Sequence, residues 1–230
     1  MSAGKKHLIV DAENVLRKTR ESRSREFELS NSIFDQWLYW SAIFLGELDI
    51  PDDRIHYFQI AYMESCREVQ SSIVLAFHGS YKNAVQILRN WLELTVAGIY
   101  YDHDQTEGQN WQRKGHHLKF KTFKRRLERD RLLSAETFQE ISEAWEKLSA
   151  YVHSLGPILE GTRAETGYGA VFAEYNQKYF DEWFGFLTEI YSLCCILLIE
   201  HIPEVLGSKE INYLLPKDKL ESLKDRVTNR

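Results

Sequence analysis

The chain has 230 residues, of which 43% are hydrophobic and 13% aromatic, and its formal net charge is −5. A chain of this length and composition can bury a full hydrophobic core, which excludes wholesale disorder. The acidic balance argues against a generally basic nucleic-acid-binding protein, although it leaves room for one local basic patch.

Cysteine usage and hydropathy indicate where such a chain works. The three cysteines, Cys66, Cys194 and Cys195, lack metal-ligand spacing, and adjacent cysteines cannot easily bridge each other, so buried thiols in a reducing cytoplasm are expected. The most apolar stretch, residues 183–202, contains two glutamates and a histidine, which favours a buried helix over a membrane span. The first apolar run is too short for a signal peptide. We therefore expect a soluble, cytoplasmic protein that is not inserted in a membrane.

The N-terminal segment "KKHLIVDAENVL", residues 5–16, runs from three apolar residues into Asp11. It resembles the first strand of PIN-like nucleases of the NYN type, where an acid at a strand end helps to hold a metal ion. Such a site needs several converging oxygen ligands, and no later acid in this chain follows a β-branched apolar run. We therefore interpret the stretch as the start of a basic helix, from Asp11 as its cap to about Glu28. This charged N-terminal helix forms the expected first unit, residues 1–30.

Apolar residues three and four apart along most of the chain predict an all-α protein. We expect one antiparallel bundle of about six to eight helices over residues 31–215, followed by a C-terminal tail, 216–230. The expected helices are 33–48, 54–77, 80–101, 119–131, 134–153, a long helix from about 172 to 200, and a short one at 217–226. The segments 102–115 and 154–169 are expected to be loops. In the long helix, apolar residues alternate four and three apart from Phe172 to Leu197, which predicts a seam inside the bundle or a contact with a second copy or a partner protein.

Two segments carry the candidate site. In "LRNWLELTVAGIYY", residues 88–101, Arg89 and Glu93 lie four residues apart beside the apolar stripe. In "EKLSAYVHSLG", residues 146–156, His153 ends its helix just before a glycine-rich loop, where an imidazole is well placed for acid–base work. Each has a structural alternative. Arg89 and Glu93 can form a boundary salt bridge, and His153 can simply gain from the helix dipole.

The hairpin that carries "LRNWLEL" and "LSAYVHS" resembles the HEPN superfamily, most closely its divergent branches in which Tyr-Val-His ends the last core helix. The resemblance covers roughly residues 55–155 and the long helix that follows. It implies an antiparallel helical bundle, often dimeric, of a prokaryotic defence or toxin–antitoxin type system that binds or cleaves RNA. Active members are metal-independent ribonucleases that use an arginine and a histidine, so no metal or other cofactor is expected.

The resemblance assigns roles to five residues. His153 matches the family's histidine and would be the acid–base group. Six positions before it stands Lys147 in place of the family's arginine, so Lys147, or Arg89 from the neighbouring helix, would hold the phosphate. Glu93 would orient one of these cations, and Tyr151 would line the site. The alternative function is a non-catalytic interaction or dimerisation module, in which Arg89, Glu93 and His153 form a buried polar network.

A basic segment, "KFKTFKRRLERDR" at residues 119–131, contains two interleaved phenylalanines. It can grip a phosphate backbone, or it can be a solvated face above inward-pointing rings, and we expect it to bind RNA. The glycine-rich loop could be a mobile lid over His153. The expected nucleic-acid contacts are Lys119, Lys121, Lys124, Arg125, Arg126 and, from that loop, Arg163. Acids and histidines between Asp102 and His117 could hold a metal ion, but loops are rich in such residues and none are paired at helical spacing, so no metal site is predicted.

Overall fold

The computed structural model describes residues 3–46, 55–114, 119–153 and 175–207, with side chains described from residue 13 onward and not for 42–46. These residues form eight α-helices, one 3-10 turn and no strand, so the prediction of an all-α helical bundle is confirmed. The predicted helix at 217–226, Arg163 and the glycine-rich loop lie outside the described residues.

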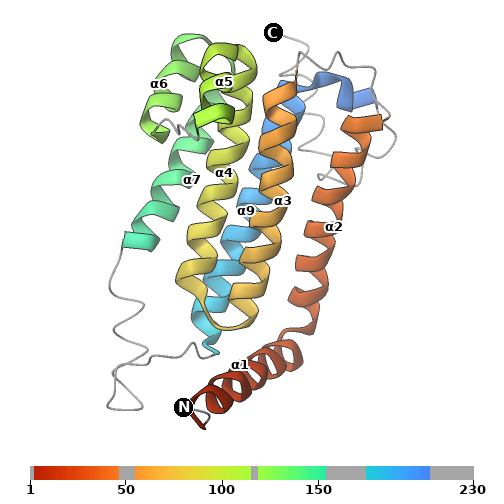
Figure 1. The fold of residues 1–230 in the computed structure, drawn as a ribbon, viewed down its shortest axis with the longest axis vertical. Coiled ribbons are helices and arrows are strands. Elements are labelled where there is room, and N and C mark those ends of the chain that lie inside the picture. The colour runs from red at the N-terminus through yellow and green to blue at the C-terminus, as the bar shows by residue number, and fades with distance from the viewer. Residues whose placement is uncertain (1–2, 47–54, 115–118, 154–174, 208–230) are drawn as a thin grey trace.

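Figure 1 shows the arrangement of the helices in the order of the chain. They are α1 (Ala3–Ser22), α2 (Ser24–Gly46), α3 (His56–Phe77), α4 (Tyr81–His103), α5 (Gln105–Lys114), α6 (Phe120–Arg129), α7 (Ala135–His153) and α9 (Gln177–His201), and a 3-10 turn, Pro203–Gly207, follows α9. The long helices α2, α3, α4, α7 and α9 lie along the long axis of the molecule. Helices α5 and α6 lie over one end, and α1 turns away from the bundle at the other end (Figure 1).

Helix α9 is buried within the bundle, against α4, α7 and α2. Its predicted seam faces the core, since Trp183, Ile190 and Leu197 are fully buried. The seam thus serves the bundle itself, and an additional contact with a second copy stays a prediction. By length and hydropathy α9 is also the one described helix that could cross a membrane, but this is weak evidence, because a mostly buried core helix passes the same test.

The closest packing in the bundle joins α3 to α4. Gly98 makes this approach possible, because a Cβ atom there would lie only 2.9 Å from the Cα of Phe58 and 3.0 Å from the Cβ of Ala61. The absence of a side chain at Gly98 therefore sets the distance between two core helices.

The N-terminal helix differs from its prediction. It begins at Ala3, so Asp11 lies within the helix and does not cap it, and the chain breaks at Arg23 instead of near Glu28. Arg23 explains the position of the break, because its guanidinium lies 2.9 Å from Asp181 and donates a hydrogen bond to Tyr175 at 3.1 Å. Asp181 belongs to the start of α9 and Tyr175 lies just before it, both more than 150 residues from Arg23, so local composition could not reveal the break.

Residues 105–114, predicted as loop, form helix α5. Asp104 caps it, because its Oδ1 accepts a hydrogen bond from the backbone N–H of Glu107 at 3.2 Å. Trp111 packs the helix against the bundle by stacking on Tyr101, with ring centroids 5.0 Å apart.

The predicted cap of α7 is confirmed, since Ser134 Oγ accepts a hydrogen bond from the backbone N–H of Thr137.

Candidate functional site

The candidate residues of α4 meet α7 at Trp145. Glu93 Oε1 accepts a hydrogen bond from Arg89 Nε at 2.8 Å and another from Trp145 Nε1 at 2.7 Å. The Arg89 guanidinium also lies over the Trp145 ring, 4.8 Å from its centroid, and Phe120 of α6 stacks on the same ring at 4.8 Å. This polar cluster joins three helices, and it engages both the charge and the flat face of Arg89.

His153 stands apart from that cluster. It is the last residue of α7, its side chain is exposed, and no described residue hydrogen-bonds to it. Trp145, the residue of α7 that contacts Arg89 and Glu93, precedes His153 by eight residues, which is about 12 Å along the helix axis. The structure therefore brings Arg89 and Glu93 together but does not bring them to His153. His153 also lies outside the buried network that the alternative function assumes.

Lys147 and Tyr151 face α9. Lys147 Nζ donates a hydrogen bond to Glu189 at 2.8 Å, which raises the pKa of the ammonium group. The Tyr151 ring lies edge-on to Phe186 at 5.5 Å, and burial, followed by the charge of Glu182, raises the pKa of its hydroxyl. Lys147 already has a carboxylate partner, and Tyr151 stays protonated at neutral pH. Because its charge is paired with Glu189, Lys147 is a weaker candidate for holding a phosphate than an unpaired cation would be.

Helix α6 presents a basic face to solvent. Its apolar residues, Phe120, Phe123 and Leu127, are buried against the bundle. Lys119, Lys121 and Arg125 are exposed and form no ion pair with any described residue, and Lys124 lies over the ring of Phe138. Between residues 119 and 131 the chain carries seven basic and two acidic side chains. This face is therefore a concentrated positive charge on a chain that is acidic overall.

Arg126 does not belong to this face, although the sequence suggested it. Its guanidinium donates hydrogen bonds to the hydroxyl of Tyr100 and, at 3.3 Å, to Glu107. The bond with Tyr100, more than any other contact, raises the pKa of Arg126. Tyr100 in turn donates to Asp104 at 2.8 Å. Arg126 thus ties α6 to α4 and α5 and contributes no free charge for a ligand.

A buried carboxylate–histidine pair lies at the same end of the bundle. Asp102 Oδ1 accepts hydrogen bonds from the backbone N–H groups of Tyr57 at 2.7 Å and Phe58 at 3.2 Å, and so caps the start of α3. Its Oδ2 lies 2.8 Å from Nε2 of His201, at the end of α9. With the Asp102 side chain only 3% exposed, one carboxylate joins three helices.

Glu200, next to His201, makes a second such connection. Its side chain accepts hydrogen bonds from the backbone N–H of Ser134 at 3.0 Å, the Ser134 hydroxyl at 2.8 Å and the Thr137 hydroxyl at 2.5 Å. Sequence reasoning missed both connections. The available signal was Glu200 itself, since a carboxylate at the end of a long apolar run must find partners when it is buried.

Among the described residues, no group of three or more histidine, cysteine, aspartate or glutamate side chains could hold a metal ion. Asp102, Asp104 and Glu107 have the protein partners given above, and His116 and His117 lie outside the described residues. No family model, curated protein or solved structure matches the chain.

Proposed function

We propose that the protein binds RNA through the basic face of α6, as a HEPN-like bundle of a defence or toxin–antitoxin type system, without a metal ion or other cofactor. The observation that supports this most is the set of exposed charges on α6, Lys119, Lys121 and Arg125, which have no acidic partner among the described residues. Exposed cations in this density attract a polyanion and release its counterions on contact.

The buried rings of α6 indicate the kind of recognition. Phe120 and Phe123 point into the bundle, so no aromatic ring of this helix is available to stack on a base, and most of the exposed side chains are charged. Contacts of this kind are made to phosphates, and they position a nucleic acid without reading its bases. We therefore expect binding that depends weakly on RNA sequence and strongly on salt.

The test is fluorescence anisotropy with a labelled single-stranded RNA at low and moderate salt. The double variant Lys121→Ala, Arg125→Ala should bind about tenfold more weakly than wild type at low salt, and its salt slope should fall by about 1.4, as expected for two lost phosphate contacts to a single strand. Both side chains are exposed, so the fold should be unchanged, which circular dichroism can verify.

The matched control is Lys18→Ala, Arg25→Ala, which removes one lysine and one arginine that are exposed on α1 and α2. This control should bind RNA like wild type. An equal loss in both double variants would contradict a local binding face and indicate general electrostatic attraction. Absence of binding by the wild type would sink the proposal and favour the interaction module.

Cleavage is the further step that the resemblance implies, with His153 as the acid–base group. The exposed imidazole is accessible to a ribose hydroxyl, but its nearest candidate cation in sequence, Lys147, is paired with Glu189. An RNA cleavage assay with EDTA throughout should compare wild type with His153→Ala. Cutting by wild type alone would establish a metal-independent ribonuclease, whereas binding without cutting would limit the function to RNA binding.

A further inference from the structure

A groove runs between α2 and α3 on the side away from α9. One face of α2 lies against α9, where Gln36 accepts a hydrogen bond from Tyr191. Between the opposite face of α2 and helix α3 lies a hollow of about 360 Å³, which α1 closes at one end. Its apolar lining includes Phe34, Ile73 and Val74. Val74 is 51% exposed, so part of this lining faces solvent. No described helix covers the groove along its length.

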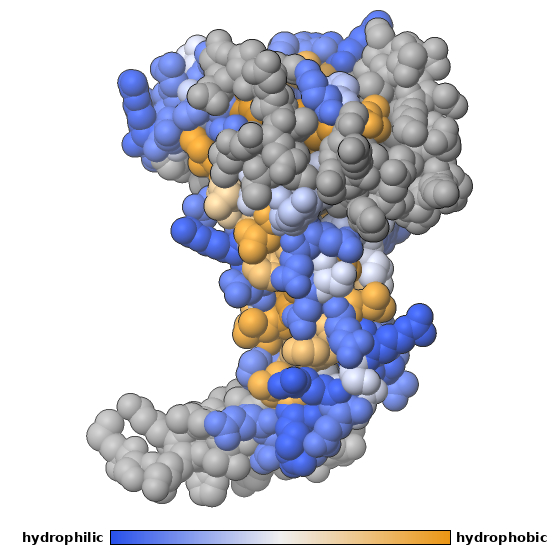
Figure 2. Space-filling view, turned by 90° about the vertical axis from the view of Figure 1, so that its right-hand side faces the viewer, coloured by the Kyte–Doolittle hydropathy of each residue, from blue (hydrophilic) through white to orange (hydrophobic). Residues whose placement is uncertain are grey.

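The residues that line the groove are spaced along α2 and α3 in a way that suits the binding of a third helix. The lining residues Asn31 and Phe34 on α2 continue to Leu38 at steps of three and four residues. On α3 the face of Val74 and Gln70 continues to Met63 past Arg67, whose charge is paired with Glu64. Such steps keep residues on one face of a helix, and two such rows side by side form the holes that a third helix fills. Leu38 and Met63 are 41% and 45% exposed. In Figure 2, which looks onto the side that lies at the right of Figure 1, apolar patches follow the middle of the molecule.

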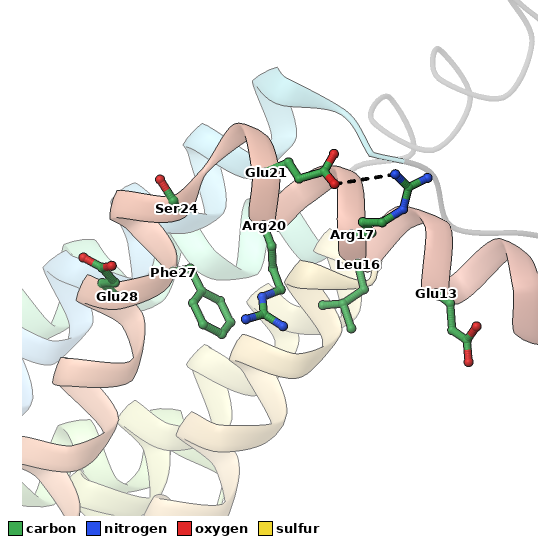
Figure 3. A pocket seen from close by; sticks show the side chains of 8 residues that line it. All are labelled: Glu13, Leu16, Arg17, Arg20, Glu21, Ser24, Phe27 and Glu28. Atoms are coloured by element: carbon green, nitrogen blue, oxygen red, sulfur yellow. Dashed lines mark ion pairs between the residues drawn. The ribbon is translucent and has the colours of Figure 1, made fainter.

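Among the described residues, Arg20 is the one arginine, lysine or carboxylate in the lining of the 360 Å³ hollow. Its guanidinium lies over the Phe27 ring, 4.6 Å from the centroid, and points between Leu16 and Phe27 beneath the bend that joins α1 to α2. Figure 3 draws the adjoining pocket, which Arg20 also lines, together with Glu13, Glu21 and Glu28. The arginines on either side of Arg20 have carboxylate partners: Arg17 lies 3.5 Å from Glu21, and Arg23 is bound to Asp181. Arg20 has no such partner among the described residues, and no acidic residue lines the 360 Å³ hollow.

We propose that this groove binds an amphipathic helix of a partner protein, with the apolar stripe of that helix between α2 and α3 and one of its carboxylates on Arg20. The exposed apolar residues Met63 and Val74 of α3 lie about 16 Å apart along the helix axis, the length of a three-turn helix, and this span extends well beyond the reach of Arg20. This length favours a helix over a small carboxylate. The site lies on helices other than α6, so it is independent of the RNA proposal.

The test uses a designed, fluorescein-labelled helical peptide of about sixteen residues, with leucines at helical spacing and one glutamate beside that stripe. We expect anisotropy to show saturable binding to the full chain, and no binding of a scrambled peptide of equal composition. Val74→Glu should abolish binding, whereas Leu29→Glu, at an exposed α2 position outside the groove lining, should leave it unchanged. Both substitutions are on the surface of helices, so both variants should stay folded.

A double-mutant cycle isolates Arg20. Arg20→Gln should lower the affinity for the glutamate peptide about fivefold, because that complex loses an ion pair. It should not change the affinity for a matched peptide with glutamine in place of the glutamate. Equal effects on both peptides would overturn the role of Arg20. Equal binding of the scrambled peptide, no effect of Val74→Glu, or no binding at all would overturn the helix site. If the chain bound the fatty acid decanoate but neither peptide, the groove would be a site for small carboxylates and not for a helix.

Discussion

Arg125 and Arg126 are adjacent in the chain, yet the structure gives them opposite roles. Arg125 is exposed and unpaired among the described residues, whereas Arg126 is bound to Tyr100 and Glu107. The sequence contained part of this distinction, because position 126 follows Phe123 by three residues and so borders the buried face of the helix. The partner of Arg126 could not be predicted, since Tyr100 and Glu107 belong to other helices.

The cysteines allow a prediction at the same scale. All three are free and buried, and burial raises the pKa of the Cys66 thiol to about 11 and that of Cys195 to about 12. A thiol reacts as its thiolate, which at pH 8 is then about one part in a thousand or less. We expect a thiol reagent such as Ellman's to label none of them quickly in the native protein and all three in guanidinium chloride. Rapid native labelling of one thiol would show that its site opens readily.

At the scale of helices, replacing a glycine with alanine should change the free energy of unfolding in opposite directions at Gly98, in the α3–α4 contact, and at Gly185 on α9. Gly98→Ala should lower the free energy of unfolding by roughly 1–2 kcal/mol, because its Cβ meets the backbone of Phe58 and the two helices must separate. Gly185→Ala on α9 should raise it by about 0.5–1 kcal/mol, because a Cβ there meets nothing within 4 Å and alanine is the better helix former. Urea unfolding would measure both. A stabilising Gly98→Ala would contradict the close packing.

The sequence predicted most helices but not the links between them. Periodicity alone located α3, α4, α6, α7 and α9 to within a few residues, because each has a clear apolar face. It missed α5, whose mean hydropathy is low and whose stability depends on Trp111 and its partner in α4. It also missed the break between α1 and α2, which is tied to α9 through Arg23. Both errors come from tertiary contacts overriding a local pattern.

At the scale of the whole molecule, Glu200 connects the end of α9 to the start of α7, and its charge can be tested. Glu200→Gln should lower the free energy of unfolding by about 1–3 kcal/mol, because an amide replaces one acceptor oxygen that faces buried donors. Glu189→Gln, which alters an exposed ion pair with Lys147, should change it by no more than about 0.5 kcal/mol. Equal effects in urea unfolding would show that the buried contacts of Glu200 contribute little.

The candidate site was only partly predictable for the same reason. The pairing of Arg89 with Glu93 follows from four-residue spacing within one helix, and the position of His153 at a helix end follows from the glycine-rich segment after it. Their separation depends on where α4 meets α7, which is set by Trp145. Asp102 and His201, 99 residues apart, meet only in the folded chain.

The distribution of charge along the bundle has a consequence for how the protein would meet its partners. On a chain of net charge −5, the basic excess of the segment 119–131 would favour the approach of a polyanion to that end of the bundle. Figure 1 places α6 at one end and the bend between α1 and α2 at the other. The 22 residues of α3 alone span about 33 Å between these ends. If both proposed ligands bind, they would occupy separate parts of the bundle and would not compete for one surface.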